Sequence, residues 1–245
     1  MALGAAERGA EVVIWDLDVE AAARVAQDIT GAGGRASAAA IDVTDSAAVR
    51  REALATGRVD VLINNAGVVS GQRLLEASEA QIRRTFEVNA LALYWTTRAF
   101  LPGMLERGRG KVVTIASAAG LIGVARQTDY AASKWAAVGF TESLRAELRK
   151  DGAPVSTLIV APYFIDTGMF EGVRTRFPLL LPILQERDVA RRVLDAIESG
   201  RQQLILPPFA ALTPAMRVLP VAAMDALADL LGINATMDDF TGRVP

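Results

Sequence analysis

Short hydrophobic runs alternate with longer segments of helical periodicity along the whole chain. The runs Glu11–Asp16, Val59–Ile63 and Lys111–Ala116 are rich in β-branched residues, which is typical of strands buried on both faces. Between them, apolar residues recur every three or four positions, as in Asp129–Lys150, and predict helices. This alternation predicts a parallel sheet covered by helices on both faces.

The other predicted elements continue the same alternation. Strands are expected at residues 35–41, 155–160 and 203–206, and helices at 18–30, 46–56, 79–106 and 188–199. The glycines of 31–34 follow a helix and precede a strand, so they are interpreted as a helix stop and not as a phosphate loop. No linker, internal repeat or low-complexity tract interrupts the pattern, so residues 1–245 are predicted to form one three-layer α/β domain with a doubly wound parallel sheet.

Composition removes several kinds of chemistry. The 245 residues include no cysteine and no histidine, which excludes a Ser-His-Asp triad, a cysteine nucleophile and a zinc site with histidine or cysteine ligands; no metal is expected. The net charge of −2 provides no basic field for nucleic acid. No apolar run is long enough to span a membrane, and the first residues do not form a signal peptide. Together with the absence of cysteine, this favours a cytoplasmic protein, with membrane association left open.

One pair of residues carries the candidate chemistry. Tyr130 and Lys134 are separated by four positions on a predicted helix and therefore share one face. A phenol has a pKa near 10, so a tyrosine that acts as a base near pH 7 needs about 4 kcal/mol of stabilisation of its phenolate. A lysine cation one turn away is suited to supply part of it. The alternative is an ordinary solvated helix face.

Further polar residues lie at predicted strand ends. Ser117 directly follows the strand at 111–116 and could donate to a developing oxyanion, or simply cap a turn. Asn64–Gly67 follows another strand, and Asn89 interrupts an apolar helix, where a buried amide could be purely structural. Asp16 and Asp42 each follow a strand, and an acid in the first position can accept the ribose hydroxyls of a dinucleotide or cap the next helix.

Taken as a set, these residues resemble the short-chain dehydrogenase/reductase family. The resemblance runs from Gly9 to about Leu219, and the family spacing is kept by Asn64-Asn65-Ala66-Gly67, Asn89, Ser117, Tyr130 and Lys134. The segments 12–16, 85–89, 94–102 and 166–170 are most similar to the branch that contains retinol dehydrogenases and 17-beta-hydroxysteroid dehydrogenases, some of which are associated with membranes. The resemblance implies a Rossmann-like fold.

The resemblance also implies a role for each matching residue. Tyr130 would be the general acid/base, and Lys134 would lower its pKa and bind the nicotinamide ribose. Ser117 would hold the substrate oxygen, and Asn89 would support a water that relays protons to Lys134. The cofactor would contact Asp16, Asp42, Val43, Asn65, Ala66, Gly67, Tyr130, Lys134, Pro162, Ile165 and Thr167. Asp16 favours NAD over NADP. The family has Pro-Gly where this chain has Pro162-Tyr163, so the resemblance does not define the path of the backbone near the nicotinamide.

The family opens with a strand and a glycine-rich loop that have no counterpart in this sequence. Met1–Arg8 matches the later turns of the helix that follows that loop, so the usual first strand is expected to be missing. That strand would lie between those at 11–16 and 59–63, and its absence would leave two interior edges without partners. We therefore expect that the functional protein has a longer N-terminus.

The expected function is NAD(H)-dependent interconversion of a lipophilic primary or secondary alcohol and its carbonyl compound. Large apolar residues in the segment 168–185 suit a substrate lid, and 207–245 would form a C-terminal extension that could contact a membrane surface or another subunit. The family pairs its subunits through two helices, here 79–106 and 129–150, which implies a homodimer or homotetramer. Trp95, Phe100, Trp135, Phe140 and Leu144 on these helices are expected to be core and helix–helix contacts. Two alternatives remain: a non-catalytic binding protein that lost the cofactor loop, and an NADP-dependent carbonyl reductase.

Overall fold

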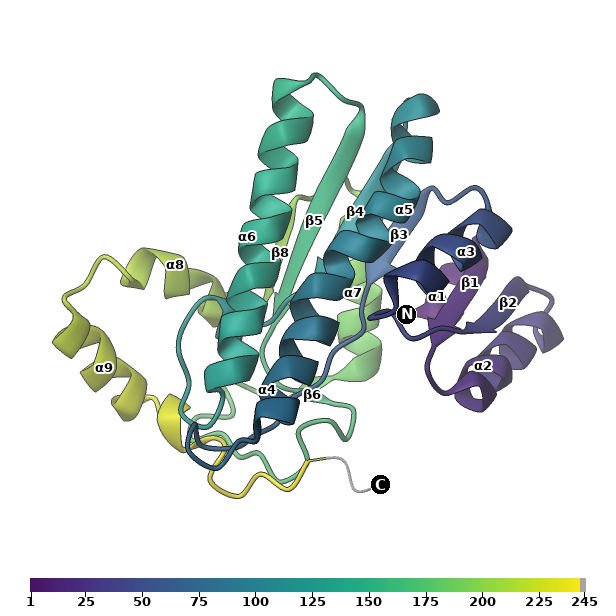
Figure 1. The fold of residues 1–245 in the computed structure, drawn as a ribbon. Coiled ribbons are helices and arrows are strands. Elements are labelled where there is room, and N and C mark those ends of the chain that lie inside the picture. The colour runs from purple at the N-terminus through teal and green to yellow at the C-terminus, as the bar shows by residue number, and fades with distance from the viewer. Residues whose placement is uncertain (243–245) are drawn as a thin grey trace.

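The predicted strands all appear in the computed structural model, which describes residues 1–242 (Figure 1). They are β1 (Glu11–Asp16), β2 (Arg35–Ala40), β3 (Val61–Asn64), β4 (Gly110–Ile115), β5 (Val155–Pro162) and β8 (Gln203–Leu206). Every pairing between them is parallel. The doubly wound, three-layer α/β fold is therefore confirmed.

The sheet is divided in two where the first strand of the family was expected. Strands β3, β4, β5 and β8 form one four-stranded sheet, whereas β1 pairs only with β2. The inner edges of β1 and β3 consequently have no partner strand among the described residues. Backbone groups at such edges need other partners, so these two edges are where the fold departs from a continuous sheet.

Helices cover both faces of the sheet. In Figure 1, α5 (Ala92–Glu106) and α6 (Thr128–Lys150) lie on one face and α7 (Glu186–Glu198) on the other. The remaining helices near the sheet are α1 (Ala2–Glu7), α2 (Val19–Gly31), α3 (Ser46–Thr56) and α4 (Glu79–Phe86). The helix expected over 79–106 is not continuous, because a π-helical turn over Glu87–Leu91 separates α4 from α5. The predicted stop after α2 is confirmed, with Gly33 at a φ of 86°.

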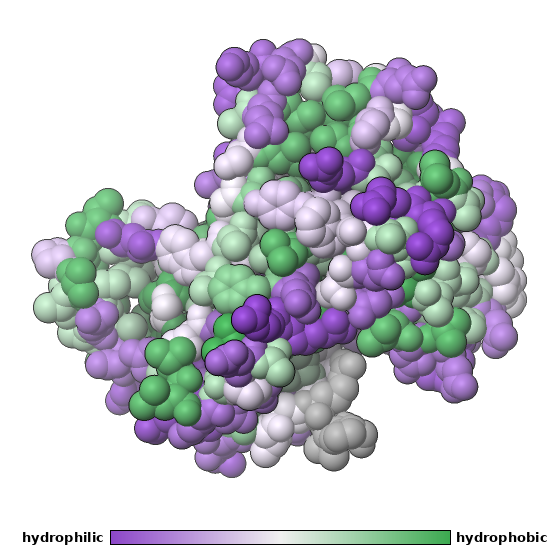
Figure 2. Space-filling model, viewed as in Figure 1, coloured by the Kyte–Doolittle hydropathy of each residue, from purple (hydrophilic) through white to green (hydrophobic). Residues whose placement is uncertain are grey.

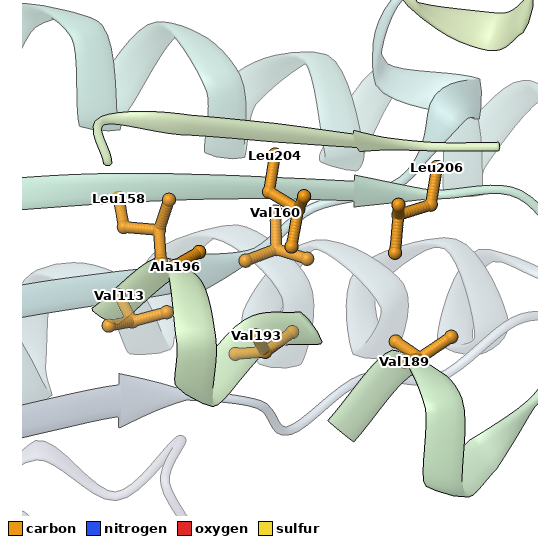
Figure 3. Close-up of a cluster of buried hydrophobic side chains, with 8 residues drawn as sticks. All are labelled: Val113, Leu158, Val160, Val189, Val193, Ala196, Leu204 and Leu206. Atoms are coloured by element: carbon orange, nitrogen blue, oxygen red, sulfur yellow. The ribbon is translucent and has the colours of Figure 1, made fainter. Parts of the chain in front are cut away.

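A compact cluster of aliphatic side chains fixes α7 against the sheet. Figure 3 shows Val189, Val193 and Ala196 of α7 facing residues of the neighbouring strands. The strand residues are Val113, Leu158, Val160, Leu204 and Leu206. Val193 and Leu158 are fully buried, and each buried side chain of this size stabilises the fold by about 1.5–3 kcal/mol.

A second core lies on the opposite face, beneath α5 and α6. Phe100 and Leu144 are buried there as predicted, and Phe140 packs beside them, while Trp135 is partly exposed. The ring of Trp15 in β1 lies 5.3 Å from that of Phe100. This contact joins β1 to the core of the larger sheet although the two strands beside the gap are not paired.

The C-terminal part contains the segment predicted to be a lid and, after it, a projecting arm. Short strands β6 (Ile165–Asp166) and β7 (Leu184–Gln185) pair in parallel and bracket the predicted lid segment. Residues 208–235, here called the arm, contain α8 (Thr213–Met216), α9 (Val221–Leu230) and flanking 3₁₀ turns, and stand out beyond α6 (Figure 1). Residues 243–245 of the predicted extension lie outside the described residues. Among those described, no helix has the length and apolar character to cross a bilayer.

Candidate active site

A single large cavity collects most of the predicted site residues. Its volume is about 1440 Å³, and it extends from the gap between β1 and β3 along the carboxyl ends of the strands to the lid and the arm. The predicted residues on its wall are Asp16, Val43, Asn65, Ala66, Gly67, Ser117, Tyr130, Lys134, Pro162, Ile165 and Thr167. Asp42 and Asn89 are not on this wall. The carboxyl edge of a doubly wound sheet is the place where such folds bind their ligands.

Ser117 and Tyr130 are brought together by the end of β4 and the start of α6. Ser117 caps the short 3₁₀ turn after β4, where its Oγ accepts a hydrogen bond of 3.1 Å from the N–H of Ala119. Tyr130 lies in the first turn of α6, is 5% exposed, and its hydroxyl is hydrogen-bonded to Ser117. Two hydroxyl groups thus meet at one point of the cavity, 13 positions apart in sequence.

The electrostatics of Tyr130 differ from the expectation. Burial raises the pKa of Tyr130 to about 12, and the hydrogen bond with Ser117 offsets only part of that effect. The Nζ of Lys134 lies 5.7 Å from the centre of the Tyr130 ring, and burial lowers the pKa of Lys134 to about 8. The expected lowering of the tyrosine pKa by Lys134 is therefore not seen, because removal from water outweighs the nearby cation. At neutral pH the phenol is protonated and can donate a proton.

Lys134 is held in place by the end of β4. Its Nζ donates a hydrogen bond of 2.9 Å to the carbonyl oxygen of Ile115, the last residue of that strand. Gly67 lies beside it, and a Cβ on Gly67 would stand 3.5 Å from both Lys134 Nζ and Asn89 Oδ1. The absence of a side chain at Gly67 therefore keeps room on the cavity wall next to the lysine.

Asn89 sits in the π-helical turn and faces the loop after β3 instead of the cavity. Its Oδ1 accepts a hydrogen bond from the N–H of Val68, and its Nδ2 donates to the Val68 carbonyl and to Ser133 Oγ, each at 2.9 Å. The Ser133 hydroxyl donates in turn to the carbonyl oxygen of Tyr130 at 2.7 Å. The Asn89 side chain therefore links this loop to the tyrosine helix.

A buried carboxylate that the sequence pattern did not predict lies next to the tyrosine. Asp129 is 5% exposed and accepts hydrogen bonds from Ser70 Oγ at 2.9 Å and Thr85 Oγ1 at 2.8 Å. It lies in the first turn of α6, where the helix dipole favours a negative charge. An acid directly before the tyrosine was the available signal, but its two hydroxyl partners are distant in sequence.

The two acids assigned to the adenosine end differ in their surroundings. Asp16 ends β1 on the cavity wall, and its Oδ1 accepts from the N–H of Asp18 at 3.0 Å. Asp42 bonds to the hydroxyl and N–H of Thr44 and pairs with Arg84 at 3.4 Å. The hydrogen bond from the Thr44 hydroxyl is the main reason that the pKa of Asp42 is lowered. Asp42 thus orders the turn after β2, and its neighbour Val43 reaches the wall.

One aromatic ring from the segment 168–185 packs against the tyrosine. The ring of Phe170 meets that of Tyr130 edge-on, with centres 5.7 Å apart, and also contacts Phe164 at 5.0 Å. At the unusual Pro162-Tyr163 position β5 ends with Pro162, and the Tyr163 N–H donates to the Leu206 carbonyl at 2.8 Å. Phe170, from the segment predicted to be a lid, thus adds an apolar ring to the cavity wall beside Tyr130.

Parts of a nicotinamide dinucleotide fit these residues. Gly67 and Lys134 leave space and a donor for a ribose, and Asp16 is placed for a second ribose at the end of β1. Pro162, Ile165 and Thr167 line the wall where the nicotinamide would lie. No glycine-rich loop among the described residues faces the cavity between these two ends, where a pyrophosphate would need backbone N–H donors.

A doubly wound sheet with serine, tyrosine and lysine at its carboxyl edge defines a nicotinamide-dependent oxidoreductase. The model of the short-chain dehydrogenase family matches residues 1–177. The chain belongs to this family, within its retinol dehydrogenase branch, and is an oxidoreductase that acts on CH–OH groups with NAD or NADP.

Relatives and solved structures agree with this assignment. Epidermal retinol dehydrogenase 2 of Mus musculus is 40% identical over 99% of this chain and 81% of its own length. A short-chain dehydrogenase from Burkholderia phymatum in complex with NAD has a TM-score of 0.78 and 28% identity, and covers 91% of this chain and 88% of its own. A metagenomic short-chain oxidoreductase in complex with NADP has a TM-score of 0.62 and 38% identity, over 66% of this chain and 73% of its own.

Proposed function

We propose that the protein interconverts a lipophilic alcohol and its carbonyl compound with NAD(H), using Tyr130 as the acid/base. The observation that carries this proposal is the contact between the Tyr130 and Ser117 hydroxyls inside a cavity whose substrate side is apolar. Such a pair can hold one oxygen atom of a substrate and exchange a proton with it.

In carbonyl reduction, the substrate oxygen would accept hydrogen bonds from Ser117 Oγ and Tyr130 Oη. Bound NADH would supply the hydride for the carbonyl carbon. Tyr130, whose pKa is raised by burial to about 12, is protonated and gives its proton to the oxygen, which completes the alcohol. Lys134, with a pKa of about 8, stays largely charged at neutral pH and stabilises the phenolate left behind. Oxidation would run through the same groups in reverse.

Asn89 is proposed as a positioning residue. Its side chain is engaged by Val68 and Ser133, so it would act by fixing the loop after β3 and the backbone carbonyl of Tyr130. A proton relay from Lys134 through water, which the resemblance implies, would then involve Asn89 through its backbone and not through its amide side chain.

The central test is the substitution Tyr130→Phe. It removes the acid/base hydroxyl but keeps the ring that packs against Phe170. Turnover should fall by about 10²–10⁴-fold, which is the contribution of a general acid, while the thermal midpoint stays close to that of the unmodified protein because the ring packing is retained. Undiminished turnover would refute the mechanism.

The proposed preference for NAD rests on Asp16. A carboxylate at the end of this strand accepts ribose hydroxyls and repels a 2′-phosphate. We expect kcat/KM to be higher with NAD than with NADP, and Asp16→Ser to reduce that preference by about tenfold or more, which corresponds to about 1.4 kcal/mol. Equal use of both cofactors by the unmodified protein would favour the alternative of an NADP-dependent carbonyl reductase.

The open edges of β1 and β3 support a second proposal about the cofactor site. We propose that residues preceding Met1 supply a strand between them and a phosphate-binding loop. Reading the DNA upstream of Met1 in frame is the direct check, and a stop codon immediately before Met1 would argue against it. In a longer chain, those amides of Val61–Asn64 that face the open edge and not β4 should become protected from hydrogen exchange.

The same gap favours one competing function, a non-catalytic binding protein without a complete cofactor site. Titration of the 245-residue chain with NADH, followed by fluorescence, separates the two. Saturable binding supports the enzyme. Failure to bind in both this chain and an extended chain would support the binding protein.

Self-association and location are also proposals. Tyr94 and Leu91 are exposed on the helices through which the family pairs its subunits, and a homodimer or homotetramer formed there would cover them. Tyr94→Asp should then shift the mass measured by light scattering toward the monomer.

Exposed Leu179 and Val218, on the lid and arm, suit peripheral contact of a cytoplasmic protein with a membrane surface. Sedimentation of the protein with phosphatidylcholine vesicles would test this contact. The variant Leu179→Glu should no longer sediment with the vesicles.

A further inference from the structure

The arm forms part of the wall of the cavity that contains the catalytic hydroxyls. On α9, Met224, Leu227, Ala228 and the adjoining Leu231 all line this cavity. Their spacing of three and four positions places them on one face of the helix. The opposite face carries Ala222 and Ala226, which are exposed. The helix therefore presents one of its apolar faces to the same space that Ser117 and Tyr130 border.

Contacts at both ends hold the arm over the cavity. After α8, the guanidinium of Arg217 stacks on the ring of Trp135 in α6, at 4.1 Å from the ring centre. After α9, Asn234 accepts a hydrogen bond of 3.4 Å from the N–H of Ala125. The Thr236 carbonyl accepts from the N–H of Arg174 in the lid at 3.3 Å. The arm is thus fixed to the tyrosine helix, to the loop before it and to the lid, and α9 bridges the space between these points.

The chemistry of this end of the cavity differs from that of the cofactor end. Charged residues on the wall, such as Arg8, Asp16 and Lys134, belong to the gap and to the carboxyl edge of the sheet. The wall contributed by the arm is built from methionine, leucine, isoleucine, phenylalanine, alanine and threonine, with no charged side chain among them. A charged or strongly hydrated group would lose its water here without gaining a partner, whereas an apolar chain would lose nothing.

We infer that the arm is the distal subsite of the substrate, and that Leu227 and Met224 of α9 set the length of apolar tail that the enzyme accepts. The inference rests on the proposed function, since the alcohol or carbonyl group would sit at Ser117 and Tyr130. The tail would pass Phe170 and Val124, which lie against the tyrosine, and end on the inner face of α9. The substrate class is an alcohol or aldehyde with a long, uncharged tail.

Binding of straight-chain alcohols of increasing length tests this without any need for turnover. The probe is a dansyl-labelled fatty alcohol, displaced by butanol, octanol, dodecanol or hexadecanol. Each added methylene should tighten binding by about fourfold until the tail reaches the end of the subsite, and affinity should then level off. In Leu227→Trp and Met224→Trp the larger ring shortens the channel, so the plateau should come at a shorter alcohol, with butanol affinity unchanged within about twofold.

Two further variants make the test decisive. Ala226→Trp adds the same ring to the outer, exposed face of α9 and should leave the plateau where it is. Leu227→Ala is a smaller change that can be used if either tryptophan variant unfolds. It should weaken the binding of dodecanol by about tenfold and leave the binding of butanol unchanged, because it removes buried contact from the tail alone. A plateau that is unchanged in the inner variants, or equal loss at every length, would overturn the inference. Length-dependent binding without NAD-dependent turnover would instead contradict the proposed function and leave the subsite standing.

Figure 2 shows that the arm also has hydrophobic residues on its outer side, at the left of the view. Val218, at 87% exposure, is among the exposed apolar side chains of this segment.

Discussion

The side chain of Asn89 pairs with both backbone groups of Val68, accepting from its N–H and donating to its carbonyl, each at 2.9 Å. This pairing imitates a strand partner for one residue of the loop after β3. It occurs at the π-helical turn between α4 and α5, a kind of distortion that is frequent at functional sites. One amide thus determines how the loop that borders the cavity meets the helices behind it.

Replacing Asn89 should destabilise the protein substantially. Asn89→Ala leaves the N–H and carbonyl of Val68 without these partners, so the free energy of unfolding should fall by about 2–4 kcal/mol. Urea denaturation measures the loss. Asn65→Ala, at an exposed site in the same loop, is the control and should stay within about 0.5 kcal/mol of the unmodified protein. Equal effects of the two changes would show that the pairing is not important.

The buried lysine predicts a specific dependence of stability on pH. Burial lowers the pKa of Lys134 from 10.5 to about 8, so the folded state holds this proton less tightly than the unfolded state. The cost of burying the charge is present in full below pH 8 and disappears above pH 10.5, so stability should rise by about 3 kcal/mol between these values. In Lys134→Met this rise should be absent. The free energy of unfolding of both proteins is measured with denaturant at several pH values. The difference between the two proteins isolates the contribution of Lys134.

The carboxylate of Asp129 should be needed for the placement of the tyrosine. Asp129→Ala removes the acceptor shared by the Ser70 and Thr85 hydroxyls and should cost about 2–3 kcal/mol of stability. It should also reduce kcat, since Asp129 precedes Tyr130 in the first turn of α6. Asp151→Ala, at the exposed C-terminal end of the same helix, should change neither quantity measurably. Loss of stability in both variants would contradict a local role.

The lid should control the acidity of the tyrosine. Phe170 covers the edge of the Tyr130 ring, and burial is the main reason that the pKa of Tyr130 is about 12. Phe170→Ala should admit water and move this pKa down toward its ordinary value near 10. Ultraviolet titration of the phenolate, with Tyr130→Phe subtracted as the background, gives the value. An unchanged pKa would mean that Phe170 does not shield the hydroxyl.

Local sequence pattern was sufficient for most of the elements. The strand and helix that flank Ser117 and Tyr130 were predicted nearly to the residue, because a β-branched run and a long amphipathic helix carry strong periodic signals. The π-helical turn was not predicted, since Glu87–Leu91 has ordinary helical residues and its geometry depends on what Asn89 bonds to. The contacts of Asp129 were missed for the same reason.

The sequence by itself determined the α/β architecture, the absence of histidine and cysteine chemistry, and the order of asparagine, serine, tyrosine and lysine that identifies the family. These features depend on residue type and spacing along one chain. Only the tertiary structure decided that burial raises the pKa of Tyr130, that Asn89 faces Val68, and that α9 closes the cavity at its far end. Each of these depends on removal from water or on contacts between segments distant in sequence, and such properties exist only once the chain has folded.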